Sequence, residues 1–304
     1  MIPLFSPLDY DWPVFRPPSE ASSLILQVTS GCSWNRCTFC EMYQGKPFRT
    51  RSPEEIELEL QAVARVWPET RRLFLADGDP LVLSSGKLLA ILQAARRHLP
   101  ALQRISAYAS PQNLDIKSVE ELRKLREAGL SLVYVGIESG CDQVLERVQK
   151  GERAESIVSG LNKAREAGIR RSVMILVGLG GALLSQVHAE HSARVANQTQ
   201  PEYLSTLVLS FPRGEKRFQQ GFGKEYRSLN LRGHLQEMHR FLACLELDRT
   251  VFRSDHVSNV LALRGTLNRD RPKLLSQLDQ FLQQVEQNPD AWEKEFSRRD
   301  HQTL

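Results

Sequence analysis

Short apolar runs alternate with longer amphipathic segments along the first two thirds of this chain. The runs cover residues 24–30, 72–78, 104–110, 132–139, 171–181 and 203–210. They are apolar on both faces, which is typical of buried parallel strands. Helix start signals lie between them, for example Ser52 as a cap residue followed by Pro53 in the first turn. Six βα units in a row predict an α/β fold with a parallel sheet that is open or curled into a barrel.

The alternation stops near residue 212. Beyond it we expect helices near 231–247 and 272–287, separated by an irregular stretch over 252–270. We therefore interpret the chain as an N-terminal extension (1–21), a βα core (22–211) and a short, mostly helical extension (212–304) that covers the core as a lid. The 41% apolar content is ample for a core of that size.

The composition limits the cellular compartments in which we expect this protein. No run of 18 apolar residues occurs, and the first 20 residues, broken by prolines and acids, lack the basic start and apolar centre of a signal peptide. We therefore expect a cytoplasmic protein with no membrane partner, whose cysteines stay reduced. The net charge of +4 is small for 304 residues and neither requires nor excludes a nucleic-acid partner.

Three of the five cysteines, Cys32, Cys37 and Cys40, fall within nine residues directly after the first predicted strand. In parallel α/β folds, reactive groups collect in the loops at the carboxyl ends of the strands. Three thiolates on one such loop can ligate three irons of a cubic 4Fe-4S cluster, which leaves one iron without a protein ligand. The spacing therefore indicates a metal site with an open coordination position.

These cysteines, with Phe39 just before the last of them, resemble the cluster loop of the radical S-adenosylmethionine (radical SAM) superfamily. "ADGDP" (76–80) stands where that family has a Gly-Gly-Glu-like turn, and residues 133–151 resemble the fourth strand and following helix of its coproporphyrinogen oxidase and elongator-like branch. The resemblance covers residues 22–210. This chain departs from the family pattern in having four residues between Cys32 and Cys37 instead of three.

The resemblance implies a partial (β/α)6 TIM-type barrel and two cofactors, a 4Fe-4S cluster and S-adenosylmethionine. The amine and carboxylate of S-adenosylmethionine would fill the open iron position, and one electron would cleave the cofactor to methionine and a 5'-deoxyadenosyl radical. The electron would come from an external donor of the flavodoxin or ferredoxin type. The radical would abstract hydrogen from an unknown substrate; a small molecule is slightly favoured, with tRNA and peptide as alternatives.

The resemblance also implies roles for single residues. Phe39 would lie against the adenine, and the turn formed by Asp77, Gly78 and Asp79 would offer a carbonyl to the methionyl ammonium. Glu138 would bind the ribose hydroxyls, and Lys150 would pair with the methionyl carboxylate. Glu138 also has an argument of its own, because an acid at the tip of a buried apolar strand is costly without a partner.

Other interpretations of the same residues stay open. The three cysteines could bind zinc with a distant histidine, or an electron-transfer cluster with Cys141 as fourth ligand. The rival function is a non-catalytic iron-sulfur or zinc protein that binds RNA or another partner through an Arg-rich stretch. That stretch contains Arg213, Lys216, Arg217, Lys224 and Arg227.

The sequence also predicts where several further cysteine, histidine and asparagine residues lie. Cys244 lies in an apolar pattern that predicts a core position. His188 and His191 are predicted at the surface. His256 and Asn259 lie in the irregular polar stretch, where loop residues often carry function, and we expect a structural role ahead of a substrate contact.

Overall fold

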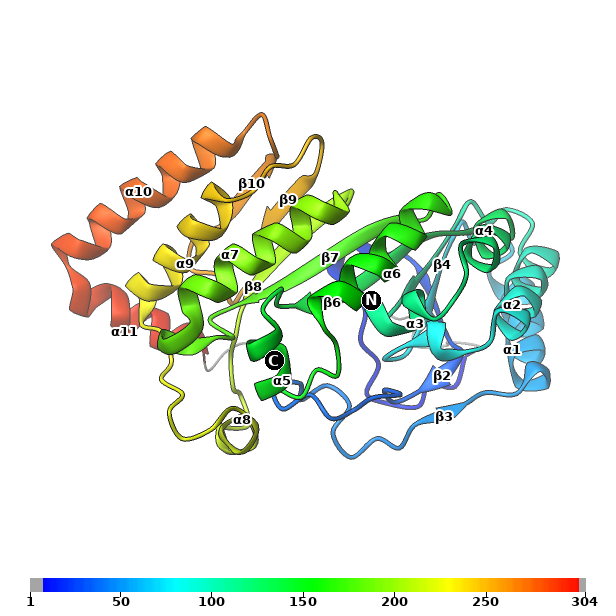
Figure 1. Ribbon diagram of the computed structural model, residues 1–304. Coiled ribbons are helices and arrows are strands. Elements are labelled where there is room, and N and C mark those ends of the chain that lie inside the picture. The colour runs from blue at the N-terminus through cyan, green and yellow to red at the C-terminus, as the bar shows by residue number, and fades with distance from the viewer. Residues whose placement is uncertain (1–7, 301–304) are drawn as a thin grey trace. The chain divides into compact units, whose positions relative to one another are not determined.

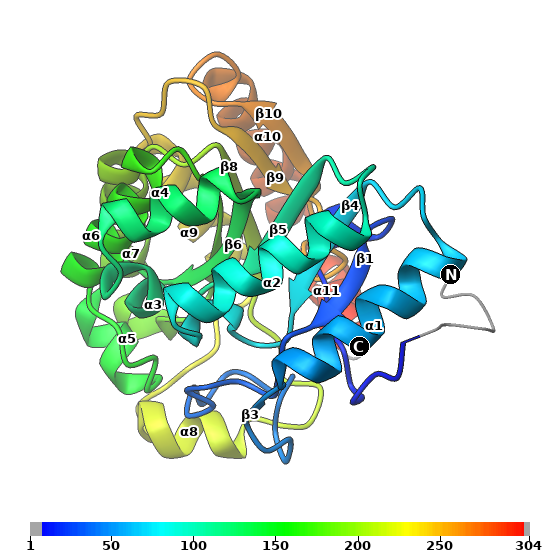
Figure 2. The same ribbon diagram turned by 90° about the vertical axis from the view of Figure 1, so that its right-hand side faces the viewer.

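The computed structural model describes residues 8–300 (Figures 1 and 2). Residues 1–7 of the predicted N-terminal extension lie outside this range. The described residues form two compact units: unit 1 contains residues 8–35, 40–135 and 160–171, and unit 2 contains residues 36–39, 136–159 and 172–300. The boundary expected at 211/212 stays a prediction.

Helices and strands follow one another in βα order along most of the chain. Unit 1 contains η1 (Pro18–Glu20), β1 (Leu24–Gln27), β2 (Thr29–Ser30), β3 (Arg49–Thr50), α1 (Pro53–Val66), β4 (Arg72–Ala76), η2 (Pro80–Val82), α2 (Ser85–His98), β5 (Arg104–Tyr108), α3 (Pro111–Asp115) and α4 (Val119–Glu127). Residues of both units form β6 (Leu130–Glu138), α6 (Ala154–Glu166) and β7 (Arg170–Val177). Unit 2 contains α5 (Asp142–Arg147), α7 (Gly181–Thr199), β8 (Tyr203–Val208), α8 (Lys216–Phe222), α9 (Leu231–Ala243), β9 (Val251–Ser254), β10 (Leu263–Thr266), α10 (Arg271–Gln287) and α11 (Pro289–Asp300).

In unit 1, the strands β1, β4, β5 and β6 are neighbours in that order and pair in parallel. Helices α1, α2 and α4 line one face of this sheet, and α1 and α2 lie side by side (Figure 2). Helix α1 begins as predicted: Ser52 accepts from the Glu55 amide at 3.1 Å and the Glu55 carboxylate accepts from the Ser52 amide at 2.7 Å. Parallel strands with intervening helices confirm the predicted α/β class.

The other face of this sheet is aromatic. The rings of Phe74, Tyr108 and Tyr134 meet edge to face, with centroids 4.9 to 6.4 Å apart. Beneath them, the fully buried Glu20 accepts hydrogen bonds from the Tyr134 hydroxyl at 2.6 Å and from Arg104 at 2.8 Å. Glu20, near the end of the predicted N-terminal extension, is therefore part of the core of unit 1, and the boundary expected at 21/22 stays a prediction.

In unit 2, β7, β8 and β9 pair in parallel in that order, and β10 is antiparallel to β9. Helices α7, α9 and α10 lie side by side along these strands (Figure 1). The stretch 252–270 was expected to be irregular, but it contains the β9–β10 hairpin, so the C-terminal extension adds two strands to its helices. Each strand has only four residues, which is too short for a clear alternation of apolar and polar residues. None of the helices in residues 8–300 combines the length and apolar composition needed to span a membrane.

His234 of unit 2 is a buried histidine with a strongly lowered pKa. It lies on α9 with 8% of its surface exposed, and its Nδ1–H donates to the Asn230 carbonyl at 3.0 Å. Burial lowers its pKa from 6.5 to about 4. The folded protein therefore holds His234 neutral at a pH where the unfolded chain already binds a proton.

This difference predicts that stability falls as the pH is lowered. The contribution of His234 is fully present above pH 6.5, declines as the pH falls from 6.5 towards 4, and changes no further below that, for a loss of about 3 kcal/mol. Urea unfolding of wild type and His234→Gln between pH 8 and pH 4 measures it. The variant should start less stable and lose less on acidification; parallel curves for the two proteins would contradict the assignment.

Candidate functional site

The cysteine loop, residues 31–48, connects two short strands of unit 1. Strands β2 and β3 pair antiparallel, with Thr29 opposite Thr50 and Ser30 opposite Arg49. The expected single strand over 24–30 is thus divided into β1 and β2, and the second part starts a hairpin. Cys32, Cys37 and Cys40 in this loop are half-buried, and, like Cys141 and Cys244, they are not in disulfide bonds.

The three cysteine side chains do not converge on a single metal position. In the described part of the chain, no three His, Cys, Asp or Glu side chains converge closely enough to hold a single metal ion. A 4Fe-4S cube places a different demand on its ligands, because each thiolate binds a different iron. Three cysteines on one short loop, none of them in a disulfide bond, are a donor set that suits such a cluster.

One carboxylate oxygen holds both ends of this loop. Asp77 follows β4, and its Oδ2 accepts from the Gly31 amide at 3.0 Å and from the Lys46 ammonium at 2.6 Å. Both side chains of the ion pair are buried. Burial raises the pKa of Asp77, and the Lys46 and Gly31 hydrogen bonds oppose that rise.

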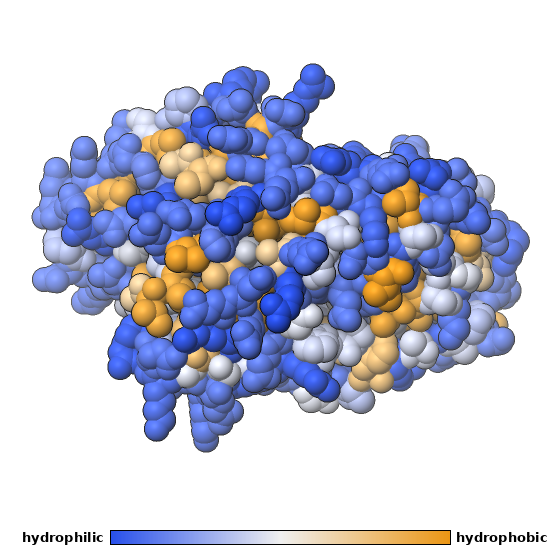
Figure 3. Space-filling model, viewed as in Figure 1, coloured by the Kyte–Doolittle hydropathy of each residue, from blue (hydrophilic) through white to orange (hydrophobic). Residues whose placement is uncertain are grey.

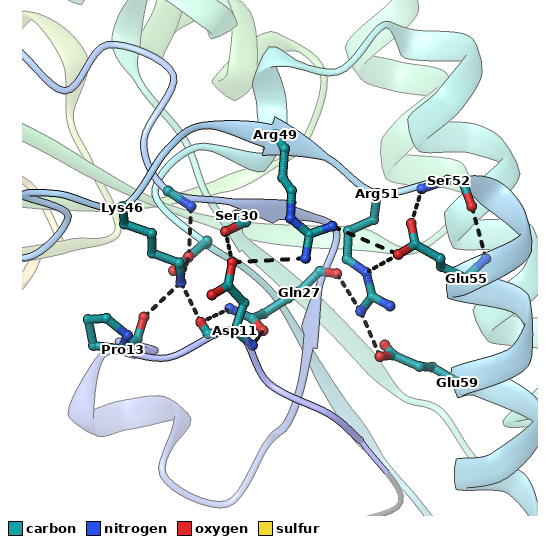
Figure 4. Close-up of polar contacts among 12 residues, drawn as sticks. Asp11, Pro13, Gln27, Ser30, Lys46, Arg49, Arg51, Ser52, Glu55 and Glu59 are labelled. Atoms are coloured by element: carbon teal, nitrogen blue, oxygen red, sulfur yellow. Dashed lines mark hydrogen bonds and ion pairs between the residues drawn. The ribbon is translucent and has the colours of Figure 1, made fainter.

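Lys46 also ties the N-terminal segment to the loop (Figure 4). Its ammonium donates to the carbonyl of Asp11 and, at 2.9 Å, to that of Pro13. The Asp11 carboxylate in turn accepts from the Ser30 hydroxyl at the start of the loop. All three protons of the Lys46 ammonium therefore have acceptors, which is the condition for burying a lysine.

Gly78 brings the turn after β4 against the first cysteine. Its amide donates to the Gly31 carbonyl at 3.0 Å. A Cβ on Gly78 would lie 2.7 Å from the Cβ of Cys32, so this close approach excludes any side chain. The glycine at this position is thus required by the position of Cys32.

The carboxylate of Asp79, the third residue of the turn, accepts hydrogen bonds from three other residues of the protein. Asp79 is buried and accepts from the Ser33 hydroxyl and the Ser110 amide, both at 3.2 Å, and from the Asn113 side-chain amide. Burial raises its pKa, and the hydrogen bonds from Asn113 and Ser110 oppose that rise. The Asp79 carboxylate and Asp77 Oδ2 are therefore engaged by protein donors, whereas Asp77 Oδ1 is buried without a hydrogen-bond partner. The carbonyl contact expected at this turn stays a prediction.

The middle of the cysteine loop, residues 36–39, belongs to unit 2. The Thr38 amide donates to the Val148 carbonyl at 3.0 Å. Phe39 packs against a hydrophobic cluster that we name the α5–α8 cluster. Its buried members are Cys141, Val144, Val148, Leu179, Leu184, Phe218, Phe222 and Tyr226. The role predicted for Phe39, a contact with adenine, is not tested by this packing and stays a prediction.

Glu138 ends β6 in a strained conformation. Its φ is 65°, a left-handed value that is uncommon for a residue other than glycine. The carboxylate folds back over Gly136, where an added Cβ would lie 2.1 Å from Glu138 Oε1. Strain at a buried acid marks this position as a candidate functional residue.

Lys150 lies 3.6 Å from Glu138 Oε1, so the predicted pair of cofactor-binding residues comes together within unit 2. Burial raises the pKa of Glu138, and the nearby Lys150 charge opposes that rise. The second carboxylate oxygen, Oε2, is buried without a hydrogen-bond partner. A buried acceptor left open in this way fits a ligand that carries hydroxyl donors.

A buried histidine supports the turn after Glu138. Ser139 accepts from the Cys141 amide at 3.0 Å and donates to His188 Nδ1 at 2.8 Å, while His188 Nε2 donates to the Leu176 carbonyl at 3.0 Å. The expectation that His188 lies at the surface is wrong, because it faces the interior of unit 2 with 1% of its surface exposed. Its spacing of four residues from the buried Leu184 was the available signal. His191, half-buried, is closer to the expectation.

The remaining candidates have structural contacts. Asn259 is buried and donates to the Thr206 carbonyl at 2.8 Å, and the half-buried His256 contacts the Ser258 hydroxyl at 2.9 Å. Cys141 is buried, whereas Cys244 caps the end of α9 and is only partly buried, so its predicted core position is correct only in part. Substrate roles for His256 and Asn259 stay untested.

The sequence pattern of the radical SAM superfamily matches residues 26–189 of this chain. Among characterised relatives, the heme chaperone HemW of Bacillus subtilis is 29% identical over 143 residues, which are 47% of this chain and 37% of HemW. This chain thus spans well under two thirds of that relative's length.

Solved structures share the fold. Coproporphyrinogen III oxidase (HemN) from Escherichia coli, a radical SAM enzyme, aligns with a TM-score of 0.54 and 18% identity over 73% of this chain and 52% of HemN. The methyltransferase TsrM from Kitasatospora setae, solved with cobalamin and a [4Fe-4S] cluster, aligns with a TM-score of 0.51 and 20% identity over 62% of this chain and 37% of TsrM. These likenesses agree with the predicted TIM-type architecture.

The pattern match covers more than half of the chain and includes the three cysteines, the turn 77–79 and Glu138. Members of the matched family use a 4Fe-4S cluster and S-adenosylmethionine. The chain belongs to the radical SAM superfamily.

Proposed function

We propose that this protein is an enzyme in which Cys32, Cys37 and Cys40 hold three irons of a 4Fe-4S cluster. The observation that carries the proposal is the cysteine loop itself, with three cysteines, none of them in a disulfide bond, between ends that Asp77 fixes. The cluster and S-adenosylmethionine would supply a one-electron cleavage that yields methionine and a 5'-deoxyadenosyl radical, which takes hydrogen from the substrate. The rival is a non-catalytic iron-sulfur or zinc protein.

Four positions would bind S-adenosylmethionine. The open Oε2 atom of Glu138 supports a contact with ribose hydroxyls, and the Lys150 ammonium beside it supports a contact with the methionyl carboxylate. The backbone of the turn 77–79 would accept from the methionyl ammonium, since Asp77 Oδ2 and the Asp79 carboxylate are engaged by protein donors. Phe39, packed on one side by the α5–α8 cluster, would present its remaining surface to the adenine.

We propose a small-molecule substrate, with tRNA and peptide as the alternatives, and an external electron donor of the flavodoxin or ferredoxin type. We also propose that the protein acts in the cytoplasm, where free thiols persist. Anaerobic metabolite comparison between cells with and without the protein would identify the substrate.

Cluster content tests the proposal most directly. Protein reconstituted without oxygen should hold about four irons and four sulfides per chain and be coloured. Reduced with dithionite in the presence of S-adenosylmethionine, it should release methionine and 5'-deoxyadenosine in equal amounts. Cys32→Ala, Cys37→Ala and Cys40→Ala should each abolish the reaction.

Cys141→Ala and Cys244→Ala are the matched controls and should keep both iron and activity. A colourless protein with one tightly bound zinc would reject the proposal in favour of the zinc interpretation. An intact cluster without cofactor cleavage would favour an electron-transfer or structural cluster instead.

The contacts at Glu138 and Lys150 predict a binding defect without loss of the cluster. Glu138→Gln and Lys150→Met should each weaken S-adenosylmethionine binding by about 1.5 to 3 kcal/mol, because a hydrogen bond to a charged group is lost. Equilibrium binding to the reconstituted protein measures it. Glu146→Gln, an exposed acid on the intervening helix, is the control. Wild-type affinity in both variants would show that these residues do not bind the cofactor.

The Asp77–Lys46 pair predicts coupled effects on the loop. Asp77→Asn or Lys46→Met alone leaves a buried charge uncompensated, which should cost about 3 to 5 kcal/mol of folding free energy and speed the loss of iron to a chelator. The double variant should cost less than the sum of the two. The free energy of unfolding and the rate of iron release are measured for wild type, the two single variants and the double variant. Additive effects of the two substitutions would show that the ion pair does not close the loop.

A further inference from the structure

The connection from β8 to α9, which contains α8, carries a concentration of positive charge. Residues 211–228 contain five Arg or Lys and two Glu, a net charge of +3. Four of the basic residues, Arg213, Lys216, Lys224 and Arg227, are exposed, and we name them the α8 basic surface. One of the two acids, Glu225, is bound to Arg147. Figure 3 shows the hydrophilic side chains that protrude over α8.

This surface adjoins the segment of the cysteine loop that belongs to unit 2. A Cβ on Gly221 of α8 would lie 2.5 Å from Thr38 Cγ2, so the helix backbone is in direct contact with the residue after Cys37. Phe218 and Phe222 of α8 share the α5–α8 cluster with Phe39. The basic surface is therefore formed by Lys216 of α8 and residues on either side of the helix, and α8 contacts the cysteine loop next to Cys37, a ligand of the proposed cluster.

An exposed apolar pair lies beside the charge. The Ala182 amide at the start of α7 donates to the Arg227 carbonyl at 2.9 Å, which places Arg227 next to the first turns of α7. On those turns Leu183 and Val187, four residues apart, are 58% and 38% exposed. An apolar centre with a charged rim is the composition of a transient protein docking surface.

We propose that the α8 basic surface, with Leu183 and Val187, docks a small acidic protein that delivers single electrons to the cluster. This inference rests on the proposed function. Electron transfer weakens steeply with distance, so a donor has to bind close to the cysteine loop, and Thr38 shows that α8 is close to it. Complementary charge would steer an acidic carrier to this surface.

The same positive charge could attract RNA, but the aromatic residues favour a protein. Proteins that bind single-stranded RNA stack its bases on exposed rings. Here the rings of Phe218, Phe222 and Tyr226 are buried and packed against one another, with centroids 4.7 to 5.5 Å apart. The exposed apolar side chains beside the charge are aliphatic, which suits a protein partner.

Charge reversal tests the proposal with reduced flavodoxin, an acidic flavoprotein, as the donor. Lys216→Glu/Lys224→Glu should lower flavodoxin-driven cleavage of S-adenosylmethionine about 10-fold at low ionic strength, and the defect should shrink as salt is added. Cleavage driven by dithionite, which needs no docking, should be unchanged. Titration of oxidised flavodoxin should show binding to wild type and about 10-fold weaker binding to the variant.

The control is Lys87→Glu/Lys273→Glu, which changes the net charge equally at exposed first-turn positions of α2 and α10, where an acid is favourable. It should match wild type in every assay. Equal flavodoxin binding by wild type and Lys216→Glu/Lys224→Glu would overturn the docking proposal, as would loss of tRNA binding with donor binding intact. Absence of dithionite-driven cleavage in a wild type that binds flavodoxin would overturn the proposed function and leave the docking surface supported.

Discussion

The cysteine loop depends on a single buried carboxylate oxygen. Asp77 Oδ2 accepts from Gly31 at one end of the loop and from Lys46 near the other, a separation of fifteen residues in sequence. Closing a loop of that length costs conformational entropy, which the β2–β3 ladder alone, with two residue pairs, offsets poorly. The carboxylate therefore fixes the span from which the three cysteines are presented.

That closure also explains why this turn can depart from the family pattern. The side chains of Asp77 and Asp79 are occupied by Lys46 and Asn113, while Gly78 leaves room for Cys32. A buried ion pair rarely adds net stability over an apolar pair of similar volume. Its value here is conformational: an apolar pair could fill the space but could not also accept from the Gly31 amide.

Much of the fold could be predicted from local sequence patterns, whereas the buried residues that hold the site in place could not. The βα alternation, the Ser52 cap and the three cysteines are read from neighbours within a few residues. Lys46 was missed because its partner lies 31 residues away, and no local pattern marks a lysine for burial. His188 was misplaced because its burial depends on Ser139 from another element. The β9–β10 hairpin was missed because its strands are too short to show a period.

The two buried ion pairs of the site differ in the distance between their charged groups. Lys46 and Asp77 are 2.6 Å apart, and the ammonium has acceptors for all three protons, although Asp77 Oδ1 is also buried without a hydrogen-bond partner. Lys150 and Glu138 are 3.6 Å apart, and Glu138 Oε2 has no hydrogen-bond partner. A ligand can satisfy that oxygen without displacing a protein contact, and the unmet desolvation cost of the acid becomes binding energy. The backbone strain at Glu138 is consistent with a residue placed for a ligand rather than for the stability of its own strand.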